Sequence, residues 1–292
     1  MTKQKSIAAR IEEIRMATGL KINSYKAVNR GTESLIIEVN EKWIFRFPRN
    51  DDAKEKMEKR LDFLVSFSKV SPLAVPAPKY LGDGFIGYKK IPGKHPRPSD
   101  IEKLAPKERL KIAKQLGLFL KALHGFKDKK INFDTGYLVM RKSDYRSCPK
   151  LIAQYLSADE LKILNAKLKA IANNPSNFEN PATIIHGDLY FNNILWDPDK
   201  KIITGILDWA EAGLGIPAMD FMDLVDFNKK SNDQFLKDIL NYYGAKNDDL
   251  FFQIKEDTII AMMNWFWFYQ KNKKSEGMTR IIKKLKMILS QS

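Results

Sequence analysis

In its second half the chain reads Ile185-His186-Gly187-Asp188-Leu189-Tyr190-Phe191-Asn192-Asn193-Ile194-Leu195, followed by Gly205-Ile206-Leu207-Asp208-Trp209. Asp188 and Asn193 share one short loop between apolar runs, and Asp208 ends the next β-like run, 208 − 188 = 20 positions after Asp188. A phosphoryl-transfer enzyme needs a carboxylate near the attacking hydroxyl and oxygen ligands for Mg²⁺. The spacing H-x-D-x-x-x-x-N with a downstream strand aspartate offers a candidate for each task.

These residues also have a structural interpretation, because Asp and Asn often cap turns. The joint pattern favours chemistry instead. Asp188 is then the catalytic base, and Asn193 and Asp208 are the Mg²⁺ ligands. His186 is expected to brace the loop by hydrogen bonds rather than to act as an acid.

The regions around the motif differ in hydrophobic period. Before residue 90, helices are predicted over 6–17 and 53–68, and strands over 24–28, 35–39, 43–47 and 85–88. The rest is mostly helical, with an apolar stripe over 106–125 and a capping box at Ser157 and Glu160 that opens a helix to about 172. Strand-like runs at 184–185, 194–196 and 202–207 flank the motif.

Composition indicates a globular protein. The 292 residues are 44% hydrophobic and 29% charged, enough for one two-lobed domain or two domains. A single cysteine, Cys148, excludes an intrachain disulfide and suits a cytoplasmic location. The longest apolar stretch, 258–269, is shorter than the roughly 20 residues that cross a bilayer, and the N-terminus lacks an apolar signal core.

The formal net charge is +15, mostly from lysine spread along the chain. Such a charge can mark a nucleic-acid or anionic-membrane partner. The sequence shows no alternation of arginine with aromatic residues, so we favour a lysine-rich solvated surface as the source of the charge. The amphipathic basic segment 280–289 is expected to pack on the protein rather than on a membrane. We expect no nucleic-acid or membrane partner, and a monomer.

The motif of His186, Asp188 and Asn193, with Asp208, is similar to the aminoglycoside phosphotransferase family, relatives of the protein kinases. The runs at 40–48 and 87–93 look most like the 2''-phosphotransferase branch, and 205–221 also resembles the macrolide 2'-phosphotransferases. The resemblance covers roughly residues 24–245.

It implies an α+β, protein-kinase-like bilobal fold. A small β-rich N-terminal nucleotide-binding lobe would span 1–89, and a larger, mainly helical catalytic and acceptor-binding lobe would span 90–292, with a hinge at about 88–93. By the same resemblance Asp188 is the base, and Asp220 is a structural carboxylate under its loop. The nucleotide phosphates would be covered by a turn that includes Gly31, Thr32 and Ser34, for which an ordinary hairpin turn is the alternative.

Arg46 occupies the strand position of the phosphate-binding lysine of kinases. Arginine keeps the charge and can fork two phosphate oxygens, although an exposed strand cation is the alternative. Its helix partner should be a glutamate. Glu58 is the first choice and Glu55, about a turn away, the second, and on so charged a helix either can simply be solvated.

Tyr88 aligns with the position behind the nucleotide base. A large tyrosine narrows an adenine pocket, and relatives with tyrosine there tend to prefer GTP. We therefore expect GTP as donor, with a core aromatic and ATP as the alternative. Backbone groups of the hinge residues Lys89, Lys90 and Ile91 would meet the base edge.

For the acceptor, Glu211, Asp223 and Asp226 can bind the amines of a cationic sugar antibiotic or can be ordinary solvated acids. Trp265 lies in an apolar run over 258–270 that is expected to be core, with part of it lining an acceptor pocket as the alternative. Relatives carry acidic residues in this run, which bind the amines of an aminoglycoside. The apolar side chains that this chain has instead also suit a less polar acceptor.

The sequence thus predicts a Mg²⁺-dependent phosphotransferase that moves the γ-phosphate of GTP, or ATP, to a hydroxyl of a small molecule, foremost an aminoglycoside antibiotic, as a resistance enzyme does. The alternatives are a macrolide 2'-phosphotransferase and a kinase of another hydroxyl metabolite. Outside the enzymes, the alternative is a non-catalytic nucleotide-binding protein, against which the intact Asp188, Asn193 and Asp208 argue. The acceptor and the hydroxyl attacked are left open.

Overall fold

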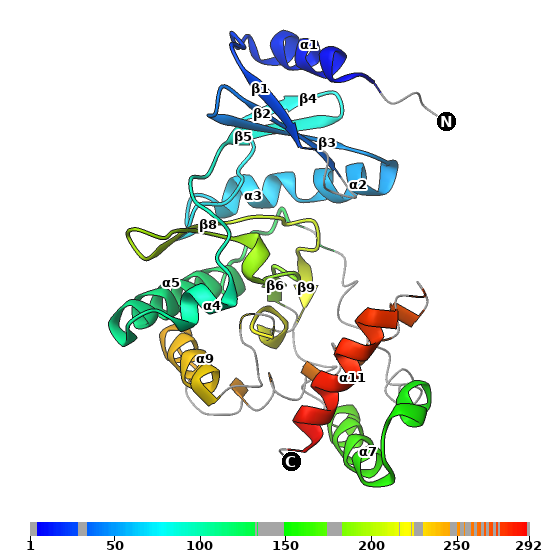
Figure 1. Ribbon diagram of the computed structural model, residues 1–292. Helices are drawn as coiled ribbons and strands as arrows, with labels where there is room; N and C mark the ends of the chain where they lie inside the picture. Colours follow the sequence, from blue (N-terminus) through cyan, green and yellow to red (C-terminus); the bar gives the residue numbers. More distant parts are fainter. Residues whose placement is uncertain are drawn as a thin grey trace. The chain divides into compact units, whose positions relative to one another are not determined.

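The computed structural model describes residues 5–28, 34–131, 133, 149–173, 183–215, 217–222, 224, 230–245, 250–251, 254, 258–259, 262–263, 266, 269–270, 273 and 275–290. The chain forms two compact units (Figure 1). Unit 1 comprises Met1–Arg97, Phe126–Asn132 and Asn192–Glu211, and unit 2 comprises Pro98–Gly125, Phe133–Phe191 and Ala212–Ser292. The motif is thus divided between the units. The predicted lobe boundary near residue 89 stays a prediction.

Unit 1 contains a five-stranded antiparallel sheet in the order β1-β2-β3-β5-β4. Its strands are β1 (Tyr25–Val28), β2 (Ser34–Val39), β3 (Trp43–Pro48), β4 (Tyr80–Gly82) and β5 (Phe85–Lys89). Residues on β3 alternate in burial, so that Trp43, Phe45 and Phe47 enter the core on one face while Arg46 lies on the other. This alternation aims Arg46 away from the core.

Helices cover both faces of this sheet (Figure 1). Helix α1 (Ile7–Thr18) packs Ile11 and Ile14 on the face of Phe45. Its ends carry ordinary signals: the Ser6 hydroxyl accepts from Ala9 N–H, and Gly19 takes the left-handed conformation at φ 67°. Helices α2 (Asp51–Lys59) and α3 (Leu61–Phe67) lie on the other face.

The single helix predicted over 53–68 is interrupted at Arg60. The Arg60 N–H donates to the carbonyl of Met57, three residues back, at 3.2 Å, which tightens the helix there. In α3, which follows this interruption, the side chains of Phe63 and Phe67 are fully buried in the core. Strand β4 also was not predicted, because three residues give no readable alternation.

A hairpin completes unit 1. Strand β7 (Ile194–Asp197) pairs antiparallel with β8 (Ile202–Ile206). Short bridges join it to earlier segments, Lys94 to Trp196 and Ala74 to Gly205. A Cβ on Gly205 would lie 2.7 Å from the Ala74 carbonyl oxygen, so the close approach needs glycine. The hairpin is thereby built into the unit that carries Arg46.

Unit 2 is mainly helical. Its described elements are α4 (Pro98–Glu102), α5 (Pro106–His124), the 3₁₀ turn η1 (Ala153–Tyr155), α7 (Ala158–Asn173), the short strands β6 (Thr183–Ile185) and β9 (Gly213–Gly215), η3 (Pro217–Asp220), α9 (Lys230–Tyr243) and α11 (Ser275–Leu289). The 3₁₀ turn η2 (Phe191–Asn193) runs across the boundary. Helix α5 packs on α9, and β6 pairs with β9.

The late apolar segments form a second core of unit 2. Ile281, Leu285 and Leu289 of α11 pack with α7, as predicted for the C-terminal basic helix. Met262, Met263 and Phe266 of the apolar run over 258–270 are buried in the same cluster, and Tyr269 packs against it while partly buried, which agrees with a core role. None of the helices in the described part of the chain combines the length and the apolar character needed to cross a membrane.

Candidate active site

In unit 2 the loop after β6 carries Asp188. Gly187 has φ 78°, a conformation that glycine adopts without strain, and it turns the chain directly after the buried His186. The Asp188 N–H donates to His186 Nδ1 at 3.3 Å. The Asp188 side chain itself is half-buried. The loop therefore holds its backbone in place while keeping the carboxylate accessible.

Asp220, in η3, holds this loop by hydrogen bonds to its backbone. It is fully buried, and its two carboxylate oxygens accept from the backbone N–H groups of His186 and Gly187, each at 2.8 Å. Burial raises the pKa of Asp220, but the hydrogen bond and charge of His124, with the His186 N–H, outweigh it and hold the pKa below its ordinary value. The carboxylate is therefore ionised at neutral pH.

His124 and Tyr243, which sequence reasoning missed, complete this support. His124, the last residue of α5, lies with Nε2 3.1 Å from Asp220 Oδ2, and Tyr243 of α9 has its hydroxyl 3.1 Å from His124 Nδ1. Since an ionised carboxylate only accepts, Nε2 is the donor. Burial, and then the charge of Asp220, raise the pKa of Tyr243. The signal in the sequence that could have found His124 is its position as a polar residue at the end of the apolar stripe over 106–125.

In unit 1 the β7–β8 hairpin brings Asn193 and Asp208 to adjacent ends. Ile194 pairs with Ile206, and the Leu207 N–H donates to the Asn193 carbonyl at 2.7 Å, so Asp208 follows directly after the closing bond. Asn193 is buried, with 6% of its surface exposed. The two residues predicted as metal ligands, 15 positions apart (208 − 193), thus belong to one hairpin end.

Asp208 has φ 58°, the left-handed region that a non-glycine residue rarely adopts. Its Oδ1 lies 3.3 Å from an Arg46 guanidinium nitrogen, and the Arg46 side chain is only 18% exposed. A guanidinium held beside a candidate metal ligand could bind phosphate oxygens of a triphosphate. The structure therefore gives Arg46 a carboxylate partner other than the helix glutamate expected.

The donor set fits Mg²⁺. Asp208 and Asn193 offer carboxylate and amide oxygens, the hard ligands that this ion prefers. Two protein ligands would leave the other positions to phosphate and water, the usual form of a Mg²⁺–nucleotide site. Within the described ranges, no group of three or more His, Cys, Asp or Glu residues is placed to hold a metal.

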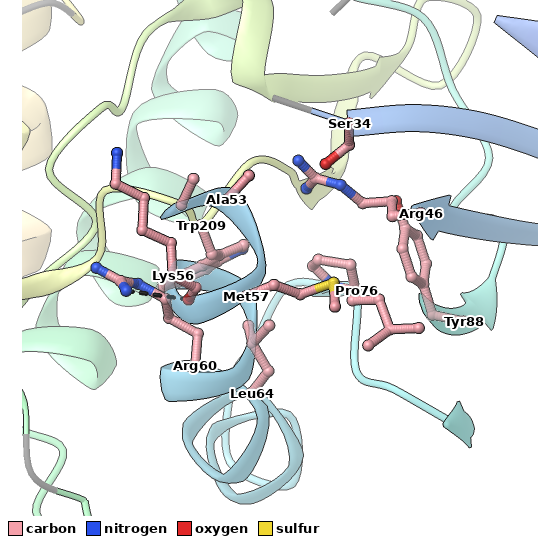
Figure 2. A pocket seen from close by; sticks show the side chains of 12 residues that line it. Ser34, Arg46, Ala53, Lys56, Met57, Arg60, Leu64, Pro76, Tyr88 and Trp209 are labelled. Carbon is pink, nitrogen blue, oxygen red and sulfur yellow. Dashed lines mark hydrogen bonds between the residues drawn. The ribbon is translucent and has the colours of Figure 1, made fainter. Parts of the chain in front are cut away.

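A cavity of about 470 Å³, part of it open to solvent, lies between β2, β3 and β5 and the α2–α3 helices (Figure 2). Its charged lining residues are Arg46, Lys56 and Arg60, and all three are cations. The Arg60 guanidinium donates to the Lys56 carbonyl at 3.0 Å. The remaining lining residues are Ser34, Ala53, Met57, Leu64, Pro76, Ile86, Tyr88, Trp209 and Ala210. This basic cavity suits an anionic ligand.

Tyr88 and Ser34 place two more predicted nucleotide residues on the cavity. Tyr88 of β5 is 6% exposed and stands beside Arg46 in Figure 2. Burial raises the pKa of the Tyr88 phenol, while the charge of Arg46 opposes the shift. Ser34 is buried at the start of β2. Gly31 and Thr32, predicted in the turn before it, lie outside the described residues.

The helix glutamates have other neighbours. Glu58 lies 3.8 Å from Lys54, and Glu55 lies 2.8 Å from Lys59, both as exposed i, i+4 pairs on α2. The α2 cation that faces segment 208–211 is Lys56, whose Nζ lies 3.2 Å from Glu211 Oε1. The pairing of Glu58 with Arg46 therefore stays a prediction.

The hinge and acceptor residues are placed only in part. The Lys90 N–H donates to the Lys42 carbonyl at 2.8 Å, its ammonium pairs with Glu38 at 2.7 Å, and Lys89 is exposed at the end of β5. Ile91 is buried. The remaining predicted acceptor residues, Asp223, Asp226 and Trp265, lie outside the described residues.

The chain was compared with known proteins. The sequence model described as the phosphotransferase enzyme family, APH, matches residues 24–252. No curated protein sequence matches the chain significantly. Among solved structures, the GDP and kanamycin complex of APH(2")-IIIa is 19% identical with a TM-score of 0.78, covering 97% of this chain and 99% of that chain.

Two further structures are similar over the same extent. The streptomycin-ATP-APH(2")-IIa ternary complex is 20% identical, with a TM-score of 0.73 and coverage of 98% and 99%. The apoenzyme of macrolide 2'-phosphotransferase MphH from Brachybacterium faecium is 16% identical, with a TM-score of 0.69 and coverage of 96% and 97%. These likenesses confirm the fold class that the sequence predicted.

Proposed function

Because the chain belongs to the phosphotransferase enzyme family, we propose that it transfers the γ-phosphate of a nucleoside triphosphate, with Mg²⁺, to a hydroxyl of a small molecule. One observation carries the proposal. The β7–β8 hairpin closes with Asn193 and Asp208 at the same end, and Arg46 lies 3.3 Å from Asp208. An amide, a carboxylate and a guanidinium so grouped suit a Mg²⁺–triphosphate.

The residues of the two units have distinct tasks in this proposal. Mg²⁺, when bound, supplies positive charge that neutralises the developing charge on the phosphates. Arg46 binds phosphate oxygens, and Asp208 and Asn193 provide the oxygens that hold the ion. Asp188 orients the acceptor hydroxyl and takes its proton, while His186 and the Asp220 carboxylate keep the Asp188 backbone in position.

The donor we propose is GTP. Tyr88 stands beside Arg46 on the basic cavity and is buried, so its ring restricts the space near the nucleotide base. The solved relatives include complexes with GDP, ADP and ATP, and ATP is therefore the alternative donor. The other nucleotide residues proposed are Gly31, Thr32, Ser34, Glu58, Lys89, Lys90 and Ile91.

The acceptor we propose is an aminoglycoside antibiotic, which would make the protein a resistance enzyme. Similar structures hold kanamycin, gentamicin or streptomycin. Met262, Met263 and Phe266 are buried in the core, so these described residues give no support to an apolar acceptor. A macrolide or another hydroxyl metabolite is the alternative. We place the enzyme in the cytoplasm, as a monomer.

Turnover of purified protein tests the proposal. Mg²⁺ with GTP or ATP would be supplied with kanamycin, gentamicin, streptomycin, a macrolide and several hydroxyl metabolites, and phosphorylated product would be measured by mass spectrometry. We expect product with an aminoglycoside, and Asp188→Asn to lower kcat by about 10²- to 10⁴-fold, because the general base is lost. Nucleotide affinity should change little.

The matched control is Asp199→Asn, the same chemical change at an exposed residue of the β7–β8 turn, which should retain full activity. Product from a macrolide alone would select the macrolide alternative. Tight Mg²⁺–nucleotide binding without transfer to any acceptor would reject the enzyme and favour the non-catalytic nucleotide-binding protein.

A further inference from the structure

Segment 208–211 is attached to the α2–α3 region at two points. Trp209 is 2% exposed, and its ring centroid lies 5.5 Å from that of Phe63 and 5.7 Å from that of Phe67. Two residues later, Glu211 pairs with Lys56 of α2 at 3.2 Å. The residues that follow Asp208 are thus held by an apolar contact and by an ion pair.

Asp208 depends on such support. Its left-handed backbone is sparsely populated for a residue with a Cβ and persists where the surrounding structure maintains it. Arg46 cannot supply this support throughout the reaction. With Mg²⁺ and nucleotide bound, Asp208 would hold the ion and Arg46 would hold phosphate oxygens, so the pair between the two side chains would be weakened. The Lys56–Glu211 pair and the Trp209 contact require no such exchange.

We propose that Lys56 and Glu211 are positioning residues for the donor, whose ion pair holds Asp208 in the orientation that binds Mg²⁺. This inference rests on the proposed function, because it takes Asp208 to be a ligand of the Mg²⁺–nucleotide. It also assigns Glu211 to the donor, whereas the sequence placed it among the acceptor-binding acids.

The pair has the properties of a link between segments. Its members are 155 residues apart in the chain, and their side chains are only 31% and 30% exposed. Lys56 also pairs with Asp52 at 3.5 Å, but Asp52 is 75% exposed and lies on α2 itself. The Glu211 contact, by contrast, joins α2 to segment 208–211. The Arg60 bond to the Lys56 carbonyl, dashed in Figure 2, further fixes this part of the helix.

Calorimetric binding of GDP, with Mg²⁺ and with EDTA, tests the inference without turnover or acceptor. We expect Glu211→Gln and Lys56→Met each to weaken Mg²⁺–GDP binding by about three- to tenfold, the range for a half-buried ion pair. Binding of metal-free GDP should stay unchanged, because the pair acts through Asp208. The exchange variant Lys56→Glu with Glu211→Lys should recover most of the loss.

Asp52→Asn is the matched control and should bind Mg²⁺–GDP as the wild type does. Unchanged affinity in both single variants would overturn the inference. An equal loss of GDP affinity with and without Mg²⁺ would also overturn it, because that result marks a merely structural pair. A raised KM for the acceptor with normal Mg²⁺–GDP binding would overturn it as well. Wild type that binds no Mg²⁺–GDP would overturn this inference together with the proposed function. Metal-specific weakening without any phosphate transfer would support the inference and reject the proposed function alone.

Discussion

At the scale of single residues, Asp220 shows how one buried carboxylate can organise the loop that carries Asp188. Its two oxygens accept from consecutive backbone N–H groups, of His186 and Gly187, and His124 provides a third donor. The three contacts together require the ionised form, because both oxygens accept and a protonated carboxyl would direct a hydrogen at one of the donors. The carboxylate therefore contributes to stability as well as to the position of Asp188.

Replacing Asp220 by Asn should destabilise the fold by about 2–4 kcal/mol, because the amide cannot accept from all three buried donors. Urea unfolding followed by circular dichroism measures this loss, with Asp199→Asn as the exposed control.

The same comparison predicts a pH dependence. The folded pKa of Asp220 lies below the unfolded value of 3.8. The stability it contributes is therefore complete above about pH 4 and is lost as the pH falls through the lower, folded pKa. The difference between wild type and variant should shrink only below about pH 4. A loss that begins well above pH 4 would contradict the assignment of this effect to Asp220.

Tyr88 decides the nucleotide in our proposal. Removing its ring by Tyr88→Ala should enlarge the base pocket and raise the kcat/KM ratio of ATP over GTP by about tenfold or more. Tyr88→Phe keeps the ring and should keep the GTP preference. Competition between the two nucleotides, measured with one acceptor, gives the ratio directly. Wild type that uses ATP as well as GTP would contradict the assignment.

At the scale of elements, helices α5 and α9 approach closely at Gly117. A Cβ there would lie 2.7 Å from Tyr242 Cβ and 2.9 Å from the Tyr243 nitrogen, and closer still to the carbonyl oxygen of Ile239. The same stretch of α9 carries the Tyr243 hydroxyl that reaches His124. Helix packing and the support of the loop that carries Asp188 are thus connected.

Gly117→Ala is predicted to destabilise the protein by about 1–3 kcal/mol, because α9 must move to admit the methyl group. Helix propensity alone predicts the opposite sign, a gain of about 1 kcal/mol. Thermal unfolding therefore distinguishes the two effects. Leu118→Ala, at the 39% exposed neighbour on α5, is the control and should change the melting temperature little. A stabilised Gly117→Ala would mean that the two helices are not packed this closely.

Elements were predictable where they were long or strongly periodic. The strands over 24–28, 35–39, 43–47 and 85–88 and the capped helix after Ser157 all appear, with ends shifted by one or two residues. Strands β4 and β9 were missed, since three residues, two of them glycine in β9, carry no pattern. The interruption at Arg60 was missed because helical period continues across it.

At the scale of the whole molecule, the net charge of +15 favours anions. Because salt screens this field, the KM for the nucleotide should rise several-fold between about 0.05 and 0.5 M NaCl. The KM for a polycationic aminoglycoside should rise less or fall, since screening also weakens its repulsion. A neutral hydroxyl acceptor is the control. Equal salt dependence for both substrates would show that only local charges matter.

The sequence by itself determined the chemical groups and their order: Asp188 in a turn after a strand, then Asn193 and Asp208. These features are local, because spacing within a loop and alternation along a strand need no distant partner. The family resemblance that rests on these residues also predicted the fold class.

Only the tertiary structure decided which groups meet. Arg46 pairs with Asp208 across 162 positions, Lys56 with Glu211 across 155, and His124 with Asp220 across 96. Such contacts depend on how separate elements pack, and hydrophobic period shows which face of an element is buried but not what lies against it. For that reason the sequence did not show that Arg46 pairs with Asp208, and His124 went unnoticed among the residues of a buried stripe.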